Sequence, residues 1–234
     1  MFKATIVGLL ITVAGISYPV CANEHAASGG SHNEAQQARA IVQRLLSENA
    51  GFMKKHAPDH FAPFVASQHP KVTVVSCCDS RVQMQALDAS PDNALFVVRD
   101  IGNQIATAEG SVEYGVHHLH TPVLLIIGHV RCGAIQAATG DYSKESASIR
   151  KELDTLHITK GGDILANVRL NVNNQVAAAV EKFAPEVKEG HLTVVGALYD
   201  FADDLKQGHG KLVVINVNGD TGAAAVRALA GEQN

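Results

Sequence analysis

Hydrophobic residues form two alternating kinds of pattern along the chain. Continuous apolar runs rich in β-branched residues predict five buried strands, at residues 71–77, 94–99, 123–129, 192–200 and 211–217. Between some of these runs the apolar residues have helical spacing, as from Thr107 to His118 and from Ile164 to Phe183. Strands that are apolar throughout and alternate with helices indicate an α/β fold with a mainly parallel central sheet covered by helices.

A further helix is predicted near the amino terminus. From Gln37 onward, Ile41, Leu45, Leu46 and Phe52 lie close to helical spacing, so this helix is amphipathic and needs a surface to lie on. The preceding residues, 23–36, are small and polar and have no hydrophobic period, which is typical of a flexible leader. No internal repeat or second boundary is visible, and we therefore expect a single domain over residues 37–234.

The first 22 residues differ from the rest of the chain. Lys3 precedes an apolar stretch of about 15 residues, and Pro19, Cys21 and Ala22 follow in a short segment of small residues. This pattern predicts a signal peptide, residues 1–22, and a periplasmic or secreted protein. A membrane anchor is the less favoured alternative, because the stretch is shorter than the ~20 residues that span a bilayer. Lipid attachment at Cys21 resembles the lipoprotein signal only loosely, so we expect no stable membrane insertion after cleavage.

The composition limits the classes of molecule that this protein is expected to bind, and it leaves the role of the cysteines open. The net charge of -4 and the pI of about 6.3 provide no basic surface of the kind that binds nucleic acid, whereas a small neutral or anionic ligand is compatible with them. The chain has four cysteines, and cleavage after Ala22 leaves Cys77, Cys78 and Cys132. Because a disulfide framework uses an even number, at least one of these thiols has another role.

Two predicted strands end in potential metal ligands. Cys77 closes the run 71–77, His129 closes the run 123–129, and Cys132 follows three residues later, where a helix is expected to start. Since ligands bind beyond the carboxyl ends of strands in open α/β sheets, these side chains can meet at one edge. Two thiolates and one imidazole suit Zn²⁺ and leave a fourth position for water. The alternative is two buried core cysteines and an internally hydrogen-bonded histidine.

The spacing of these residues resembles a known family. Cys77, Asp79 and Arg81 form a C-x-D-x-R motif at a strand end, and about fifty residues later His129 opens an H-x-x-C-G motif. Together they resemble the β-class carbonic anhydrases. The similarity continues over nearly everything after the leader, in the segments "FVVRDIGN", "EGSVEYGVHHL", "ANVRLNVNNQV" and "VGALYD".

The resemblance implies a reaction and a catalytic site. Cys77, His129 and Cys132 would bind Zn²⁺, and a zinc-bound hydroxide would attack carbon dioxide in the reversible formation of bicarbonate and a proton. Asp79 would accept the proton of that hydroxide in a hydrogen bond, and Arg81 would hold Asp79 by a bidentate pair.

The resemblance also implies further contacts and an assembly. Gln68 matches a glutamine that contacts substrate, and Gly133 falls where a backbone N–H near the metal is expected. The family fold forms a homodimer or a dimer of dimers, with the active site at or near the subunit interface and the amino-terminal helix packed on the partner subunit.

This sequence departs from the family pattern at several positions. Cys78 stands where a small residue without a thiol is usual, and Asp100 stands where asparagine is commoner. Some members have a regulatory bicarbonate site with a tryptophan at the position of Val74, while Arg99 and Tyr199 resemble the other parts of that site. We therefore expect this regulation to be absent or altered.

Other functions stay open at this stage. The same site could hydrolyse a sulfur analogue of carbon dioxide, or the protein could bind metal without catalysis, although the Asp79 and Arg81 pair argues against the latter. A thiol-disulfide protein would use Cys77 and Cys78, whose adjacency gives a strained ring. The histidines of the segment "GVHHLH" are typical of a surface or helix face, and we assign them no role.

The amino-terminal pattern gives the first testable prediction. Because the apolar stretch is short and ends in small residues, the chain should be exported and cleaved after Ala22. Amino-terminal sequencing of the protein from the extracytoplasmic fraction should begin at Asn23. A sequence that begins at Met1 in that fraction would contradict the prediction.

Overall fold

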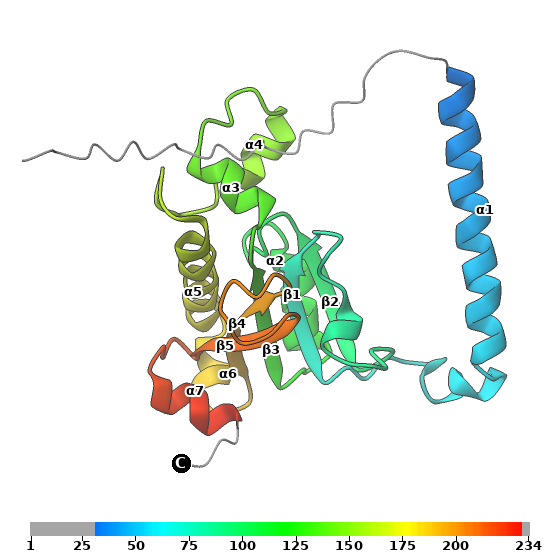
Figure 1. Ribbon diagram of the computed structural model, residues 1–234. Helices are drawn as coiled ribbons and strands as arrows, with labels where there is room; N and C mark the ends of the chain where they lie inside the picture. The colour runs from blue at the N-terminus through cyan, green and yellow to red at the C-terminus, as the bar shows by residue number, and fades with distance from the viewer. Residues whose placement is uncertain (1–30, 231–234) are drawn as a thin grey trace, which may run out of the picture. The chain divides into compact units, whose positions relative to one another are not determined.

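The structure is a computed structural model that describes residues 31–230 (Figure 1). The predicted signal peptide, residues 1–22, and the leader as far as residue 30 lie outside the described residues. The chain divides into two compact units, Met1–His60 and Phe61–Asn234. The boundary between the units falls after His60, and the single domain over residues 37–234 stays a prediction.

In the first unit, the described residues form helix α1 (Ser31–Lys55) and a short 3₁₀ turn, η1 (Pro58–His60). The predicted helix is confirmed. The predicted leader, residues 23–36, was too long, because residues 31–36 are helical. The good helix formers Glu, Ala and Gln at positions 34–36 account for the earlier start. The apolar side chains Ile41, Leu45 and Leu46 are 53, 57 and 66 % exposed.

The second unit contains a central sheet with helices packed on it. Its strands are β1 (Val72–Cys77), β2 (Leu95–Asp100), β3 (Val123–His129), β4 (Thr193–Asp200) and β5 (Lys211–Val217). Its longer helices are α3 (Gly133–Thr139), α4 (Ala147–Leu153), α5 (Ile164–Lys182) and α7 (Ala223–Ala230). The shorter helical segments are η2 (Ala62–Phe64), η3 (Met84–Ala86), α2 (Glu109–Glu113), the π-helical turn η4 (Tyr114–His118) and α6 (Ala184–Lys188). Within residues 31–230, no helix has the length and apolar character needed to cross a bilayer.

The strand order is β2-β1-β3-β4-β5 (Figure 1). The pairs β1–β2, β1–β3 and β3–β4 are parallel, and β5 runs antiparallel to β4. The mainly parallel sheet is therefore confirmed, and each predicted strand agrees with the observed one to within a residue at either end. After β1 the chain moves outward to β2, and it then returns to place β3 on the other side of β1.

Helix α5 lies close against the sheet because two strand residues lack side chains. A Cβ atom on Gly128 of β3 would come within 2.6 Å of Val172 on α5, and one on Gly196 of β4 would come within 2.8 Å of the same residue. Side chains at these positions would push the helix away. On the opposite face, Val74, Ile127 and Ala197 are at most 1 % exposed. Burial on both faces explains why the strands are apolar throughout rather than alternating.

The loop after β4 is organised by one buried carboxylate. Asp200 is fully buried, and its two oxygens accept hydrogen bonds from the amides of Ala202, Asp204 and Leu205 at 3.1, 3.0 and 2.7 Å. Burial raises the pKa of Asp200, but these amide N–H donors outweigh it and lower the pKa below the ordinary value. The ionised side chain therefore fixes the path of residues 201–205.

Asp200→Asn should destabilise the protein by about 1–3 kcal/mol at pH 7, because it removes the charged acceptor. Since the pKa of Asp200 is lowered in the folded protein, its contribution is present above the unfolded pKa near ~3.9 and is lost as the pH falls through the folded value. Urea unfolding with chelator present should therefore show a smaller difference from the parent at pH 3 than at pH 7. Glu181→Gln, on the exposed side of α5, serves as the control, and an equal difference at both pH values would contradict the prediction.

Candidate metal centre

The topology brings the ends of β1 and β3 together at a switch point. These two strands are parallel neighbours, but the chain leaves β1 toward β2 and leaves β3 toward β4, on opposite sides. A crevice forms where neighbouring connections diverge in this way. Cys77 is the last residue of β1, His129 is the last residue of β3, and Cys132 directly precedes α3.

The structure gathers the three predicted ligands. The sulfur atoms of Cys77 and Cys132 and a ring nitrogen of His129 all lie within 4.8 Å of one another. The three residues are 4, 1 and 0 % exposed. A tetrahedral zinc with bonds of about 2.3 Å to sulfur and 2.0 Å to nitrogen places its ligand atoms roughly 3.5–3.8 Å apart, so the cluster is compatible in size with that ion.

His129 presents a nitrogen suited to a metal. Its Nδ1 lies 3.0 Å from the carbonyl oxygen of Val130, and because a carbonyl only accepts, Nδ1 carries the proton and donates. The lone pair is then on Nε2, which is buried and has no hydrogen-bond partner in the part of the chain that the structure describes. A backbone carbonyl that fixes the tautomer in this way is typical of metal-binding histidines.

The surroundings of the two sulfurs favour negative charge. Backbone hydrogen bonds from Gly102 and Asp79 act to lower the pKa of Cys77, and those from Ala134 and Ile135 in the first turn of α3 act to lower the pKa of Cys132. A hydrogen bond from the Cys132 thiol lowers the pKa of Cys77 to about 4, and the same bond together with burial raises the pKa of Cys132. Without a cation the pair therefore holds one proton. A cation such as Zn²⁺ would replace that proton and take both cysteines as thiolates.

Asp79 and Arg81 lie beside the cluster as a bidentate pair. The Nε and Nη2 groups of Arg81 donate to Oδ1 and Oδ2 of Asp79 at 2.9 and 2.7 Å, and the backbone amide of Arg81 donates to Oδ1 at 2.9 Å. These contacts lower the pKa of Asp79 to about 2. Oδ2 lies 3.8 Å from Nε2 of His129, so an ionised carboxylate oxygen faces the same space as the three ligand atoms.

The loop that carries this pair is held by Arg99 of β2. Its guanidinium donates to the carbonyl oxygens of Cys77, Asp79 and Val82 at distances of 2.7–3.2 Å. The sequence suggested only a regulatory resemblance for Arg99 and missed this role. A charged residue inside an otherwise apolar strand was the available clue.

Arg81 is also supported by the loops after β3 and β4. Its guanidinium carbon lies 4.6 Å from the ring centroid of Phe201, and its Nη2 donates to the carbonyl oxygen of Arg131 at 3.2 Å. Arg131 has a left-handed backbone with φ of 56° and pairs with Asp204 at 2.9 Å. The Phe201 ring lies 6.0 Å from the His129 ring. The position of Phe201 gave no signal in the sequence, because a phenylalanine in a loop has no spacing to interpret.

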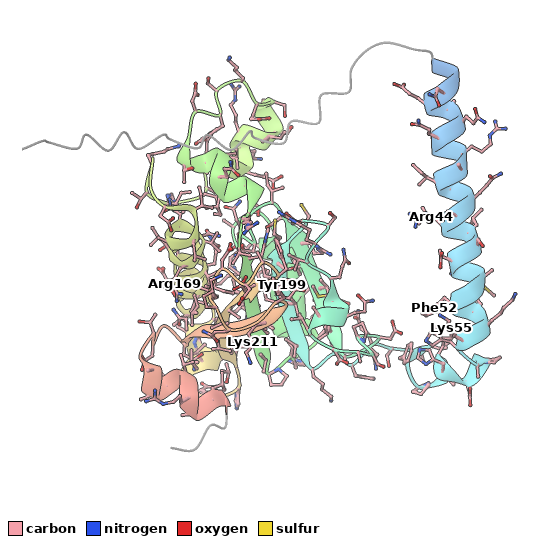
Figure 2. The ribbon with its side chains drawn as sticks, in the orientation of Figure 1. Arg44, Phe52, Lys55, Arg169, Tyr199 and Lys211 are labelled. Atoms are coloured by element: carbon pink, nitrogen blue, oxygen red, sulfur yellow. The ribbon has the colours of Figure 1, made fainter. Side chains whose placement is uncertain are left out.

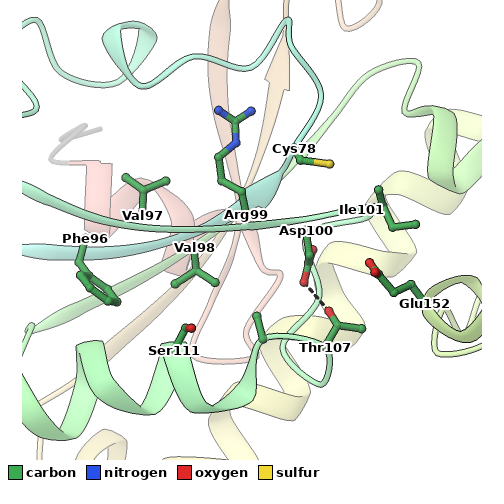
Figure 3. A pocket seen from close by; sticks show the side chains of 11 residues that line it. Cys78, Phe96, Val97, Val98, Arg99, Asp100, Ile101, Thr107, Ser111 and Glu152 are labelled. Carbon is green, nitrogen blue, oxygen red and sulfur yellow. Dashed lines mark hydrogen bonds between the residues drawn. The ribbon is translucent and has the colours of Figure 1, made fainter. Parts of the chain in front are cut away.

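Cys78 does not join the cluster. It is exposed and lines a pocket of about 540 Å³, together with Arg99, Asp100 and Glu152. In Figure 3 the Cys78 side chain lies near Asp100, whose carboxylate accepts a hydrogen bond from Thr107. Cys77 is buried at the ligand cluster, so the two neighbouring thiols have different surroundings. This arrangement disfavours a redox pair of Cys77 and Cys78.

The two predicted substrate-binding residues, Gln68 and Gly133, lie at different distances from the ligand cluster. Gln68 is exposed and precedes β1, at the end of that strand opposite Cys77, and β1 itself is roughly 16 Å long. Within one chain the structure therefore does not bring Gln68 to the cluster, because a parallel strand carries its two ends to opposite edges. Gly133 is the first residue of α3, next to Cys132, and a Cβ atom there would meet nothing within 4 Å.

The structure also shows where the residues lie that correspond to the regulatory bicarbonate site of some family members. Val74 is fully buried in β1, and Arg99 is occupied with the carbonyls of the Cys77 loop. Tyr199 lies on β4 as the register neighbour of His129 and is labelled in Figure 2. Asp100, which stands where asparagine is commoner in the family, has its pKa raised to about 6 by burial.

The chain is similar to known carbonic anhydrases. A family model described as carbonic anhydrase matches residues 72–208. Carbonic anhydrase 2 of Mycobacterium tuberculosis is 40 % identical over 81 residues, which cover 34 % of this chain and 39 % of that protein. Beta carbonic anhydrase 5 of Arabidopsis thaliana is 26 % identical over 170 residues, which cover 62 % of this chain and 56 % of the relative. The alignments thus span about two fifths to just over half of these relatives.

Solved structures share the fold. A tetrameric β-carbonic anhydrase from Sordaria macrospora superposes with a TM-score of 0.63 at 21 % identity, covering 76 % of this chain and 98 % of that one. The β-carbonic anhydrase CafA of Aspergillus fumigatus gives a TM-score of 0.62 at 21 % identity, with coverage of 85 and 99 %. At this level of identity the similarity establishes the α/β architecture.

Proposed function

Because this chain belongs to the β-class carbonic anhydrase family, we propose that it catalyses the reversible hydration of carbon dioxide to bicarbonate and a proton, with Zn²⁺ as its cofactor. The observation that carries the proposal is the buried cluster of Cys77, His129 and Cys132, in which Nε2 of His129 has no hydrogen-bond partner among the described residues. The ionised Asp79 beside the cluster separates this arrangement from a closed structural metal site.

Cys77, His129 and Cys132 would hold the ion, and a zinc ion in such a site supplies a nucleophile at neutral pH by acidifying water. The side chains of the protein must then orient the attacking water. With its pKa lowered to about 2, Asp79 is a weak base at neutral pH, so it acts as a hydrogen-bond acceptor and not as a proton carrier. At Oδ2 it can accept a hydrogen bond from the attacking water and so direct the oxygen lone pair toward carbon dioxide.

Arg81 orients Asp79 and does not react. It occupies both carboxylate oxygens, so one orientation of the Asp79 side chain is favoured over the others. Arg99 holds the backbone of the same loop, and Phe201 limits the movement of Arg81 from the other side. These contacts support a preorganised acceptor, which is how an active site stabilises charge without reorganising during the reaction.

A homodimer or a dimer of dimers is part of the proposal. The related enzyme from Sordaria macrospora is described as tetrameric. Gln68 lies at the wrong end of β1 for its own cluster, so a role in substrate binding requires a second copy of the chain. The exposed apolar residues of α1 agree with a helix that packs on such a copy. Gly133 would contribute its backbone N–H in the first turn of α3.

Cys132→Ser should reduce zinc from about one ion per chain to a small fraction, and carbon dioxide hydration should fall more than about 100-fold. The reason is that the variant loses one of three buried ligand atoms. Elemental analysis and stopped-flow hydration assays measure the two effects. Cys78→Ser is the matched control and should keep zinc and most of the activity, because Cys78 faces the separate pocket.

Full zinc occupancy in Cys132→Ser would remove that residue from the ligand set, and loss of zinc in Cys78→Ser would mean that the wrong cysteine was chosen. The same samples can be assayed for hydrolysis of carbonyl sulfide. Turnover of carbonyl sulfide faster than hydration of carbon dioxide would favour the hydrolase alternative on the same site.

Arg81→Ala should lower hydration activity about 10- to 100-fold with zinc still bound, because Asp79 loses its orienting partner while the three ligands stay in place. Phe201→Leu should give a smaller loss in the same direction. Stopped-flow assays beside zinc analysis check both variants. Arg169→Ala, on the exposed side of α5 (Figure 2), is the control. An Arg81→Ala enzyme with full activity would show that the pair is only a structural ion pair.

A further inference from the structure

A second cluster of metal-ligating side chains lies at the opposite edge of the sheet. A pocket of about 440 Å³ is lined by His117 of η4, by His120 in the turn before β3, by Glu186 of α6 and by His191 in the turn before β4. None of these residues belongs to the site proposed above. They come from three separate segments of the chain, so the sequence groups only two of them.

The backbone of this pocket is well tied together. The amide of Thr121 donates to the carbonyl of Gly115 at 3.2 Å, which fixes the turn carrying His120 against η4. The amide of Thr193 donates to the carbonyl of Pro122 at 2.9 Å and joins the two turns. The amide of His191 donates to the carbonyl of Glu186 at 2.8 Å, which holds that turn on α6.

In this pocket His117 and Glu186 already contact each other, whereas His120 and His191 are exposed. Nε2 of His117 lies 3.0 Å from Oε1 of Glu186, and the His117 ring packs edge-on against Phe183 at 5.1 Å. Nδ1 of His191 lies 3.5 Å from Oε2 of Glu189, and the His191 side chain is 74 % exposed. His120 is also exposed. His117 and Glu186 are therefore placed together, while His120 and His191 are exposed side chains that line the same pocket.

Three imidazoles and a carboxylate on one concave surface are the ligands that Zn²⁺ and similar divalent transition cations prefer. We propose that His117, His120, His191 and Glu186 form a second Zn²⁺ site, which closes when the exposed rings rotate onto the ion. Its donor atoms are less tightly gathered than those of the Cys77 cluster, and it has no thiolate, so it binds zinc more weakly and exchangeably.

The two sites are separate in space and in chemistry. His120 precedes β3 and His129 ends it, so about 20 Å of extended strand lies between them. The second site does not depend on the proposed hydration activity, because it uses none of the residues assigned to that reaction. Its ligands are nitrogen and oxygen atoms, whereas the Cys77 cluster offers two sulfurs, and this difference provides a spectroscopic distinction.

The test uses the zinc-loaded protein, dialysed so that only tightly bound metal stays, and titrates it with Zn²⁺ in a calorimeter. We expect one additional zinc per chain with lower affinity than the first. The double variant His117→Ala/His191→Ala should weaken this second step about 100-fold or more and leave the tight zinc unchanged. His118→Ala is the matched control, since His118 packs on Tyr114 at 4.4 Å and does not line the pocket.

A parallel titration with Co²⁺ identifies the ligands. The second equivalent should add visible absorption without the sulfur-to-cobalt charge-transfer band that a thiolate site produces. Thermal unfolding shows that each variant is folded. The proposal is overturned if no second equivalent binds, if the double variant binds it as tightly as the His118→Ala control, or if half an equivalent binds and the protein doubles in size, which would place the ion between two chains.

Discussion

A buried imidazole nitrogen that has no hydrogen-bond partner within residues 31–230 is the constraint around which the proposed centre is arranged. Leaving such an acceptor unpaired costs about 1–3 kcal/mol, and the fold accepts that cost at Nε2 of His129. The nearby groups are consistent with a cation as the missing partner. The carbonyl of Val130 directs the lone pair inward, and amide N–H groups at both sulfurs stabilise thiolates. The ends of β1 and β3 and the start of α3 therefore direct their donor atoms toward the same candidate metal position.

Outside the ligands, a chain of contacts leads from the centre to the sheet. The buried Asp200 fixes the loop after β4, that loop places Phe201 over Arg81, and Arg81 holds Asp79 beside His129. From the other side, Arg99 fixes the backbone of the Cys77 loop. The orientation of a single carboxylate thus depends on residues from β1, β2 and β4. Such support is what a preorganised acceptor needs, because a free carboxylate would sample many rotamers.

The arrangement within one chain also indicates why an assembly is part of the proposed function. Gln68 and the three ligands lie at opposite ends of β1, and no local rearrangement brings the two ends of one strand together. The apolar side chains of α1 are exposed within their own unit. Both features are accounted for if a second copy supplies the missing cover and the missing polar group. The histidine pocket lies at the edge of the sheet opposite the ligands, so the second zinc site proposed there would be separate from the first.

The sequence by itself determined the elements and the ligand types. Continuous apolar runs located all five strands, because burial on both faces leaves no alternation, and the placing of Cys77 and His129 at strand ends pointed to a common edge. It could not place Arg99, Phe201 or Gln68, nor gather the histidine pocket, since these depend on which strands are neighbours and where each loop returns. The start of α1 also escaped it, because residues 31–36 are polar and have no hydrophobic period to detect. Local patterns thus fixed strands and donor atoms, whereas contacts between residues far apart in sequence were decided by the strand order β2-β1-β3-β4-β5 and by the packing it imposes.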